Sequence, residues 1–343
     1  MNPKLQTGCS ILAGGLILVT GATGFTGRNL VSHLAKNGAR IRATARHTSD
    51  VTCLQGLPVE WIRGELHDPE YIRKAMDGVS YVFHLATAFR ETFRPYQEQY
   101  NVHVASTKLL AAEAARQPGF RRFVHVSTIG VHGHVESPPG DENCPFAPGD
   151  TYQQTKLEAE QWILAHGRNT GLPVTVVRPA GIFGPGDDRL LKIFRMASRR
   201  LVPVVGRGKH LLHLIHVDDL VRFMVLVADH PKALNEVFIC GNKDPISLET
   251  IIAIASREYG IRNRIVRIPV APVMAAAVVC DRICSPLGIQ PPIFPRRVAF
   301  FTKDRAFDTS KIRRVLDFQT YYDNESGITQ MARWYRDHAA AAG

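Results

Sequence analysis

LILVTGATGFTG, residues Leu16 to Gly27, is the stretch that decides the fold. Its apolar first half is typical of a buried strand, and residues Asn29 to Leu34 carry apolar side chains at helical spacing. Gly21, Gly24 and Gly27 are therefore expected in a strand-to-helix turn, where glycine permits close approach of the backbone to phosphate. Amides at the start of such a helix face an anion. The stretch predicts a dinucleotide pyrophosphate site, with G-x-x-G-x-x-G spacing in place of the commoner G-x-G-x-x-G.

Short apolar runs alternate with helical patterns through the first half of the chain. Runs typical of strands occur at residues 16–19, 39–45, 59–63, 81–85, 123–126 and 173–177. Helical patterns cover residues 69–76, 101–116 and 152–166. Strands that alternate with helices form βαβ units, so the sequence predicts an α/β fold with a Rossmann-type doubly wound parallel sheet. Ligands of such sheets bind at the carboxyl ends of the strands.

The composition changes after residue 178, where proline and glycine crowd into positions 179–186. Such a crowd marks a domain border or a functional loop. A helical pattern at residues 217–228 is expected to return to the first domain, and a chain of 343 residues is long enough for two domains. We predict a dinucleotide-binding domain of residues 1–180 with 215–240, and a smaller α/β substrate-binding region of residues 181–214 with 241–343.

The net charge and the cysteines indicate which kinds of partner the protein binds and in which cellular compartment it is expected. The formal net charge of +11 favours anionic partners and fits a phosphorylated cofactor. Basic residues are spread over the whole length, so nucleic acid is not expected. The six cysteines form no C-x-x-C pair and have no histidine at ligand spacing, which predicts reduced thiols, no metal site and a cytoplasmic protein. Residues 11–19 are broken by glycines and lack a small-residue cleavage site, so a signal peptide is not expected.

Another apolar stretch, residues 268–289, bears on membranes. Asp281 and Arg282 interrupt it, so a transmembrane helix is not expected. Packing against the substrate pocket or against a dimer partner is the favoured interpretation. Shallow contact with a membrane surface is the less favoured alternative.

Tyr152 and Lys156 lie at i and i+4 in the first turn of a predicted helix, close enough to interact. A phenol with its ordinary pKa of about 10 is a poor base at neutral pH, but a nearby cation lowers that pKa by roughly 1 to 3 units. Tyr152 is thereby a candidate for proton transfer. Ser127 and Thr128 end the fifth predicted strand, at the same carboxyl edge of the sheet.

Taken together in this order, the motifs make the chain resemble an extended short-chain dehydrogenase/reductase of the NAD-dependent epimerase/dehydratase superfamily. The resemblance covers residues 16 to about 220, and the tail through Trp334 and Tyr335 is similar too. The segments that carry it are Thr20–Gly27, Val82–Ala86, Asn101–Val102, Val126–Thr128, Tyr152 with Lys156, Arg178–Pro179, Gly184–Pro185 and His216–Asp219.

This resemblance implies roles for individual residues. Tyr152 is implied as the acid/base, Lys156 as the group that holds the ribose and lowers the pKa of Tyr152, and Thr128 as the hydroxyl that orients the substrate oxygen. Thr128 is preferred to Ser127 because its distance from Gly133 matches the family's S-x-x-x-x-G, although His132 stands where many relatives have tyrosine. The residues implied in cofactor binding are Gly21, Thr23, Gly24, Phe25, Thr26, Gly27, Arg46, Glu65, Leu66, Leu85, Ala86, Thr87, Tyr152, Lys156 and Pro179.

The choice of cofactor depends on the residue about 20 positions after the glycine turn, where an acid binds the ribose of NAD and an arginine accommodates the 2′-phosphate of NADP. This chain has Arg46 there, with Arg42 before it. A charge-assisted hydrogen bond is worth about 1.5 to 3 kcal/mol, so we expect NADP(H), with NAD(H) as the alternative. Glu65 occupies the position where relatives usually carry the aspartate that meets adenine.

Two branches of the resembled family compete for the substrate. Segments 184–189, 206–209, 244–246 and 307–311 are similar to the 3β-hydroxysteroid and sterol dehydrogenases, and segment 41–46 to dihydroflavonol reductases. Sugar-nucleotide epimerases and dehydratases usually have an arginine where this chain has Leu212, and Gly-Asp after a later arginine, where Val298 follows Arg297.

These departures favour an NADP(H)-dependent oxidoreductase that interconverts a carbonyl and an alcohol of a bulky, apolar small molecule. A nucleotide-sugar epimerase or dehydratase with tightly bound NAD(P), and a non-catalytic NADPH-binding regulator, remain as alternatives. Relatives usually pair through a helix bundle, which here implies a homodimer through residues 101–116 and the Tyr152 helix.

Overall fold

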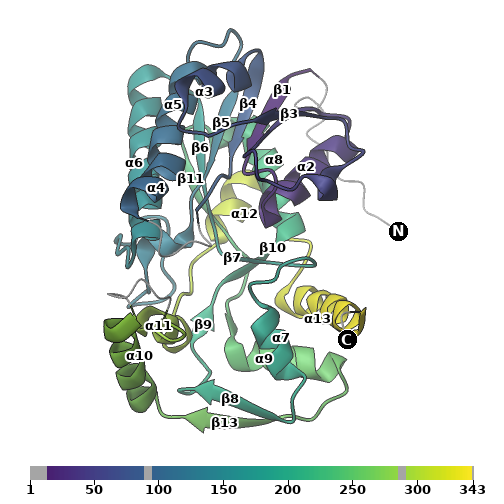
Figure 1. Cartoon of the computed structure of the whole chain (residues 1–343), viewed down its shortest axis with the longest axis vertical. Helices are drawn as coiled ribbons and strands as arrows, with labels where there is room; N and C mark the ends of the chain where they lie inside the picture. The colour runs from purple at the N-terminus through teal and green to yellow at the C-terminus, as the bar shows by residue number, and fades with distance from the viewer. Residues whose placement is uncertain (1–13, 89–94, 285–290, 342–343) are drawn as a thin grey trace.

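A parallel sheet forms the upper half of the molecule in the computed structural model, which describes residues 14–88, 95–284 and 291–341 (Figure 1). Over these residues the sheet has seven strands in the order β11-β6-β5-β4-β1-β2-β3. They are β1 Leu16–Thr20, β2 Arg40–Ala45, β3 Val59–Arg63, β4 Val79–His84, β5 Arg122–Val126, β6 Val174–Pro179 and β11 Val237–Cys240. The predicted α/β doubly wound fold is confirmed. The six predicted strands are present, whereas β11 was missed because its 4 residues are too few to show a period.

Helices cover both faces of this sheet because successive side chains of each strand point to opposite sides. Ile17 and Val19 share a core with helices α2 (Phe25–Lys36) and α8 (Val217–Asp229). Leu16 and Leu18 share a core with α3 (Pro69–Met76), α5 (Ser106–Ala114) and α6 (Thr151–Thr170). The chain order reverses between the neighbouring strands β1 and β4. A doubly wound sheet binds its ligand in the crevice at such a reversal.

The helix predicted at residues 101–116 differs in detail from the observed one. It begins earlier, with α4 (Tyr96–Tyr100), passes through a π-helical turn at Asn101–Ala105 and continues as α5 to Ala114. A π turn holds one extra residue, which an apolar period of 3.6 cannot reveal, and such turns are frequent at functional sites. Here the turn carries His103, whose side chain is fully buried.

The rest of the chain forms the lower half in Figure 1, around a second core. Its elements are β7 Gly181–Phe183, α7 Leu191–Ala197, β8 Leu201–Val205, β9 Leu211–Leu212, β10 Leu214–His216, β12 Ile246–Ser247, α9 Leu248–Glu258, β13 Arg264–Ile268, α10 Val270–Cys284, α11 Pro295–Thr302 and α13 Asn324–Ala341. Helix α12 (Ser310–Leu316) instead packs in the first core, against β11. Phe194, Ile251 and Met331 meet in this core from α7, α9 and α13. None of the helices in the described ranges is both long and apolar enough to cross a membrane.

The His216–Asp219 motif joins the C-terminal segment to α8 of the upper half. The buried carboxylate of Asp219 accepts hydrogen bonds from the backbone nitrogens of Tyr321 at 2.7 Å and Tyr322 at 2.9 Å, and pairs with Arg222 at 2.6 Å. His216 Nδ1 accepts from the amide of Asp218 at 3.2 Å and so caps α8. This motif therefore has a structural function: it fixes the tail against the start of α8.

Candidate active site

The glycine turn is so tight that side chains would collide within it. Gly21 has a φ of +69°, and a Cβ there would lie 2.8 Å from the backbone nitrogen of Ala86. A Cβ on Gly27 would lie 2.1 Å from the carbonyl oxygen of Gly21, so only glycine allows α2 to start this close to β1. The predicted strand-turn-helix geometry is therefore present at the end of β1.

The first turn of α2 has no side-chain acceptor among the described residues. Its N-cap is Gly24, which makes no side-chain capping bond, and the first turn contains no acidic residue. By contrast, Asp68 caps α3 and Asp150 caps α6 through their carboxylates. The α2 amides thus remain suited to an external anion. The cradle fits the pyrophosphate of a dinucleotide, which residues Gly21 to Gly27 would hold.

Strands β1 and β4 are joined at their carboxyl ends beside this turn. Thr20 Oγ1 lies 2.7 Å from His84 Nδ1 and accepts from the amide of Ala86 at 3.3 Å. Ser106 Oγ lies 3.2 Å from His84 Nε2, so the buried imidazole is held on both sides. Burial lowers the pKa of His84 to about 3, which keeps the ring neutral. Leu85 and Ala86, both predicted to contact the cofactor, follow directly at the crevice.

The loop after β2 is organised by an arginine that sequence reasoning missed. Arg63 Nη1 donates to the carbonyl oxygens of Arg46 at 3.0 Å and of His47 and Ser49 at 3.2 Å. The Arg46 side chain is exposed. Arg42 is directed elsewhere: it donates to Asp77 O at 2.6 Å and pairs with Glu60 at 2.9 Å.

The Arg42 side chain is thus engaged by the Glu60 carboxylate and by the carbonyl oxygens of Ala75 and Asp77. Glu65 is exposed and Leu66 is half-buried in the loop between β3 and α3. That loop follows β3, which pairs with β2, so both predicted residues lie on the Arg46 side of the sheet.

A loop from the lower half packs against the start of α2. Arg28 Nη2 donates to Gly186 O at 2.6 Å, and the guanidinium groups of Arg28 and Arg189 lie 5.5 and 5.4 Å from the centre of the Phe25 ring. Phe25 is thus flanked by two cations. The sequence predicted Phe25, but it offered no signal for these arginines because the contact joins segments far apart in the chain.

The phenol of Tyr152 lies among hydroxyls from two strand ends. Thr87, after β4, and Thr128, after β5, hydrogen-bond its side chain. Burial raises the pKa of Tyr152, while these two hydrogen bonds and the positive charge of Arg189 oppose that rise. Thr128 Oγ1 also accepts from the amide of Gly130 at 3.0 Å, which fixes its rotamer. The geometry brings together Tyr152 and Thr128, which the sequence paired, and adds Thr87.

Lys156 lies one turn further along α6 and is buried. Its Nζ donates to the carbonyl oxygen of Val126 at the end of β5. Burial lowers the pKa of Lys156 to about 8, and the negative charge of Glu160 opposes this. The lowering of the Tyr152 pKa by Lys156 stays a prediction, since the hydrogen bonds and the charge that lower it in this structure come from Thr87, Arg189 and Thr128.

His103 connects α6 to the loop after β4. Its Nε2 accepts from the amide of Ala88 at 3.1 Å and lies 3.2 Å from Thr87 Oγ1, while its Nδ1 lies 2.8 Å from Thr155 Oγ1. Burial and the charge of Lys156 hold the pKa of His103 well below its usual range. A neutral ring that accepts at Nε2 carries its proton on Nδ1, which therefore donates to Thr155. Its edge also meets the Tyr152 ring at 5.5 Å.

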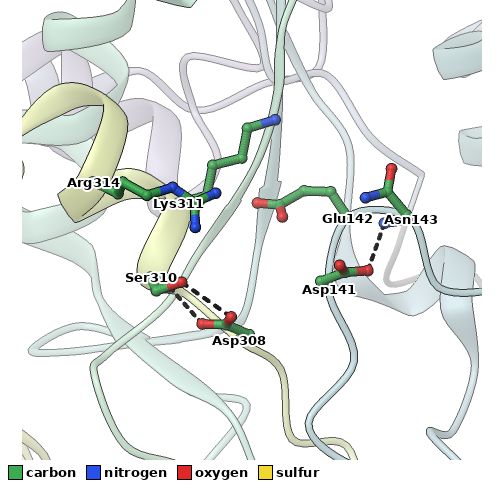
Figure 2. Close-up of a pocket in the computed structure, with 7 residues that line it drawn as sticks. All are labelled: Asp141, Glu142, Asn143, Asp308, Ser310, Lys311 and Arg314. Atoms are coloured by element: carbon green, nitrogen blue, oxygen red, sulfur yellow. Dashed lines mark hydrogen bonds between the residues drawn. The ribbon is translucent and has the colours of Figure 1, made fainter.

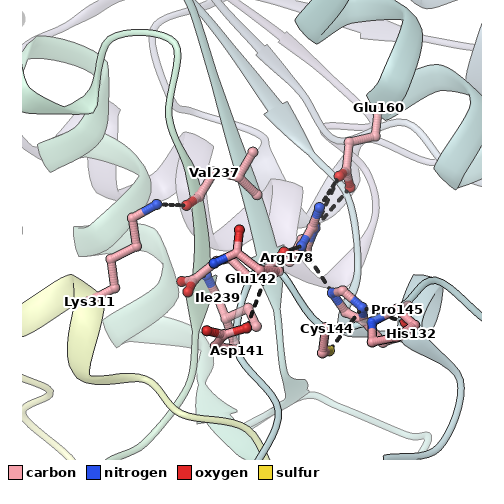
Figure 3. A network of polar contacts seen from close by, with 11 residues as sticks. His132, Asp141, Glu142, Cys144, Pro145, Glu160, Arg178, Val237, Ile239 and Lys311 are labelled. Atoms are coloured by element: carbon pink, nitrogen blue, oxygen red, sulfur yellow. Dashed lines mark hydrogen bonds and ion pairs between the residues drawn. The ribbon is translucent and has the colours of Figure 1, made fainter.

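Figure 3 shows a buried polar network behind the site. Arg178 pairs with Glu160 through Nε at 3.0 Å and Nη2 at 2.5 Å, and its Nη1 lies 2.9 Å from His132 Nε2. Burial and then the charge of Arg178 lower the pKa of His132, so the neutral ring accepts at Nε2 and donates from Nδ1 to Pro145 O at 3.2 Å. His132, which departs from the family pattern, thus has a structural position in this network.

A polar pocket of about 300 Å³ lies apart from these residues, between the loop at 141–143 and α12 (Figure 2). Its side chains are bonded within the protein: Glu142 accepts from Ile239 N at 2.9 Å, and Asp308 accepts from Ser310 N at 2.7 Å. Lys311 donates to Glu236 at 2.8 Å. The pocket contains none of the predicted catalytic or cofactor residues.

Leu212 and Arg297 are the positions at which the sequence departs from the pattern of sugar-nucleotide enzymes. Leu212 is buried in β9, where it pairs with Ile246 of β12 in the second core. The side chain of Arg297 lies outside the described residues. Pro179 ends β6, buried, next to Cys240 of β11.

Comparison with known proteins agrees with this geometry. The model of the NAD dependent epimerase/dehydratase family matches residues 17–241. Sterol demethylase protein B of Methylococcus capsulatus is 42% identical over 177 residues, which are 50% of this chain and 53% of that protein, so the match spans about half of each. The 3 beta-hydroxysteroid dehydrogenase/Delta 5-->4-isomerase of Mycobacterium tuberculosis is 28% identical over 94% of this chain and 90% of its own.

Among solved structures, the dTDP-glucose 4,6-dehydratase of Bacillus anthracis in complex with NAD superposes with a TM-score of 0.75 at 20% identity, over 95% of this chain and 98% of the other. At this identity the likeness concerns the fold. The match of the family model to most of the chain, together with the glycine cradle and the sheet order, leads to one conclusion. The chain belongs to the NAD-dependent epimerase/dehydratase family and is an enzyme of the extended short-chain dehydrogenase/reductase type.

Proposed function

We propose that this enzyme is an NADP(H)-dependent oxidoreductase that interconverts a carbonyl and an alcohol on a bulky, apolar substrate, with Tyr152 as the acid/base. The observation that carries the proposal is the half-buried Tyr152, whose phenol is hydrogen-bonded by Thr87 and Thr128 at the carboxyl edge of the sheet. A phenol with two hydroxyls beside it is suited to hold a substrate oxygen and move one proton to or from it.

Each residue has a stated task in this mechanism. A nicotinamide cofactor, when bound, supplies or accepts the hydride. In the direction of reduction, Tyr152 gives its phenolic proton to the carbonyl oxygen, and the Thr128 hydroxyl orients that oxygen. In the direction of oxidation, the phenolate of Tyr152 takes the proton of the alcohol. Lys156 holds the ribose, and its positive charge favours the phenolate.

Arg46 is the basis for NADP(H) over NAD(H). Its exposed side chain follows β2, and Arg63 orders the backbone around it through three carbonyl oxygens. Arg46→Ala should raise the Kd for NADPH by about 10- to 150-fold and leave that for NADH nearly unchanged, because one charge-assisted hydrogen bond to the 2′-phosphate is lost. Fluorescence titration with both cofactors measures this. Equal Kd values for the two cofactors in the unaltered enzyme would contradict the preference.

The proposed substrate class follows from Leu212 and from the names of relatives. Leu212 places an aliphatic side chain where a diphosphate clamp would need a cation, and the relatives named above include a sterol demethylase protein and a hydroxysteroid dehydrogenase. The substrate we propose is therefore a hydroxysteroid-like, flavonoid-like or similarly bulky alcohol or ketone. The two-domain division, the homodimer and the cytoplasmic location remain predictions alongside it.

A substrate panel tests the proposed reaction. NADPH oxidation is measured with ketosteroids, flavanonols and simple aldehydes, and UDP-sugars are assayed in parallel for epimerisation. Turnover of at least one carbonyl compound is the expected result. Turnover with sugar nucleotides alone would favour the epimerase alternative, and NADPH binding without turnover of any compound would favour a non-catalytic regulator.

A further inference from the structure

Helix α10 exposes an apolar stripe. Ala271, Pro272, Ala275, Ala276, Val279 and Ile283 are exposed along it, at the three- and four-residue spacing of one helix face. Val279 and Ile283 are 56% and 59% accessible. The opposite side of the helix packs on α11, and Ala277 is buried there. A helix of a soluble enzyme normally turns its apolar side inward, so this face is built to be covered.

Exposed basic residues lie on the strands that precede the helix and in its last turn. Strand β13 ends at Ile268 and α10 begins at Val270, while the neighbouring strand β8 leads to Gly206, where a Cβ would lie 3.1 Å from Val270 Cγ2. Figure 1 shows β8, β13, α10 and α11 together at the lower end of the molecule. The exposed cations of these segments are Arg199, Arg200, Arg207, Lys209, Arg262, Arg264, Arg267 and Arg282, of which Arg267 pairs with Glu249 of α9 at 3.2 Å. Segments 199–209 and 261–284 contain a single acidic residue, Asp281.

We propose that α10 lies on the surface of an anionic lipid bilayer, with its apolar stripe among the acyl chains and the surrounding arginines against the headgroups. An amphipathic helix that combines an apolar face with basic neighbours binds such a surface through buried area and electrostatic attraction together. A second copy of this chain fits less well, because a two-fold contact through α10 would bring the same arginines face to face.

The helix pair is connected to the candidate active site. The segment after α11 runs beside the loop that follows Thr128: Val135 N donates to Asp304 O at 3.0 Å, and Arg305 Nε donates to Gly133 O at 3.2 Å. A bilayer-bound α10 would therefore hold the Thr128 loop close to the lipid. Direct supply of an apolar substrate from the membrane rests on the proposed function, whereas membrane binding itself does not.

Vesicle co-sedimentation tests the proposal. The full chain is mixed with vesicles of phosphatidylcholine alone or of phosphatidylcholine with phosphatidylserine, and the bound fraction is measured. Binding to the anionic vesicles that weakens with salt is expected. The double variant Val279→Glu/Ile283→Glu should lose at least about 10-fold in affinity. Arg207→Gln and Arg282→Gln should each lose about 5-fold on anionic vesicles alone.

Leu234→Glu is the matched control, since Leu234 is an exposed apolar residue of the upper half, and it should bind like the unaltered chain. Circular dichroism and NADPH titration establish that each variant is folded, so a failure of the proposed reaction is distinguished from a failure of membrane binding. The proposal is overturned if the full chain binds neither vesicle, or if the double variant binds as well as the control. It is equally overturned if the double variant abolishes self-association of a chain that does not bind lipid.

Discussion

Lys156 and Glu160 lie one turn apart on the same face of α6, and both are buried. They differ in the partner that each charged group has. The Glu160 carboxylate is neutralised by the Arg178 guanidinium through three contacts between 2.5 and 3.2 Å. The Lys156 ammonium has a backbone carbonyl as its bonded partner, and its pKa falls to about 8. Removing one partner of a buried ion pair leaves an uncompensated charge, so Glu160 and Arg178 depend on each other, whereas we expect a functional role for a buried ammonium whose bonded partner is a backbone carbonyl.

Tyr152, one turn before Lys156, should show the largest effect. Tyr152→Phe removes the proton that the substrate oxygen exchanges, so kcat should fall by about 10²- to 10⁴-fold. The Kd for NADPH should stay nearly unchanged, because the ring and its packing remain. Steady-state kinetics and fluorescence titration measure the two quantities. Loss of cofactor binding together with activity would assign Tyr152 to binding and remove it from the mechanism.

Glu160→Ala tests the structural role that we assign to Glu160. This change leaves the buried Arg178 without its carboxylate, so the free energy of unfolding should fall by about 3 to 5 kcal/mol. Urea unfolding measures it. Glu158→Ala on the same helix is the control: its carboxylate accepts from the exposed hydroxyl of Tyr96 at 2.9 Å, and its loss should cost less than about 1 kcal/mol. Equal losses for the two variants would contradict the assignment.

Lys156→Met tests the functional role that we propose for Lys156. This change should stabilise the fold while it lowers activity. Burial lowers the lysine pKa from 10.5 to about 8, so at pH 7 the folded state holds a proton at a cost of roughly 3 kcal/mol that methionine avoids. Between pH 8 and 10.5 the folded lysine releases its proton before the unfolded one does, so the advantage of methionine should shrink across that window.

Urea unfolding of both proteins at several pH values measures the difference. Lys192→Met, at an exposed lysine of α7, controls for the substitution itself and should show no such window. A Lys156→Met protein that is less stable than the parent at pH 7 would mean that the bond to Val126 O outweighs the cost of burial.

His103 should have the smallest effect of the four. His103→Phe keeps an aromatic ring but removes the bonds to Ala88 N and Thr155 Oγ1 that tie the Thr87 loop to α6, and kcat should fall by up to about 10-fold. His103→Gln retains an acceptor for the Ala88 amide and should recover part of the rate. A rate in His103→Phe equal to that of the parent would show that α6 and the loop are held by other contacts.

Local chemistry was readable from the sequence. The glycine turn, the Tyr152–Lys156 pair and the alternation of strands and helices depend on residues within a few positions of one another, so spacing alone predicts them. The His216–Asp219 motif was also recognisable. Its contact with the C-terminal tail, however, depends on Tyr321 and Tyr322, which lie about a hundred positions later. No local pattern carries such a contact.

The contributions of long-range contacts could not be predicted. Arg63 and Arg46 meet because β2 and β3 pair in parallel, and that same pairing places Arg42 opposite Glu60. The Arg28 and Arg189 guanidinium groups flank Phe25 because the loop from the lower half returns to α2. Each depends on where a distant segment comes to rest.

By itself the sequence determined a Rossmann-type α/β fold, a dinucleotide turn and a tyrosine-based candidate site, because these depend on the glycine Cβ, on side-chain period and on helical spacing. The tertiary structure decided which charges are compensated. In the folded chain Glu160 pairs with Arg178, whereas Lys156 donates to a backbone carbonyl. His103, in the π turn, connects α6 to the loop after β4, and α10 exposes an apolar face. Whether a charged side chain is buried, and whether it has a partner of opposite charge, depends on how the whole chain packs. Sequence spacing therefore cannot distinguish Glu160 from Lys156, whereas the tertiary structure does.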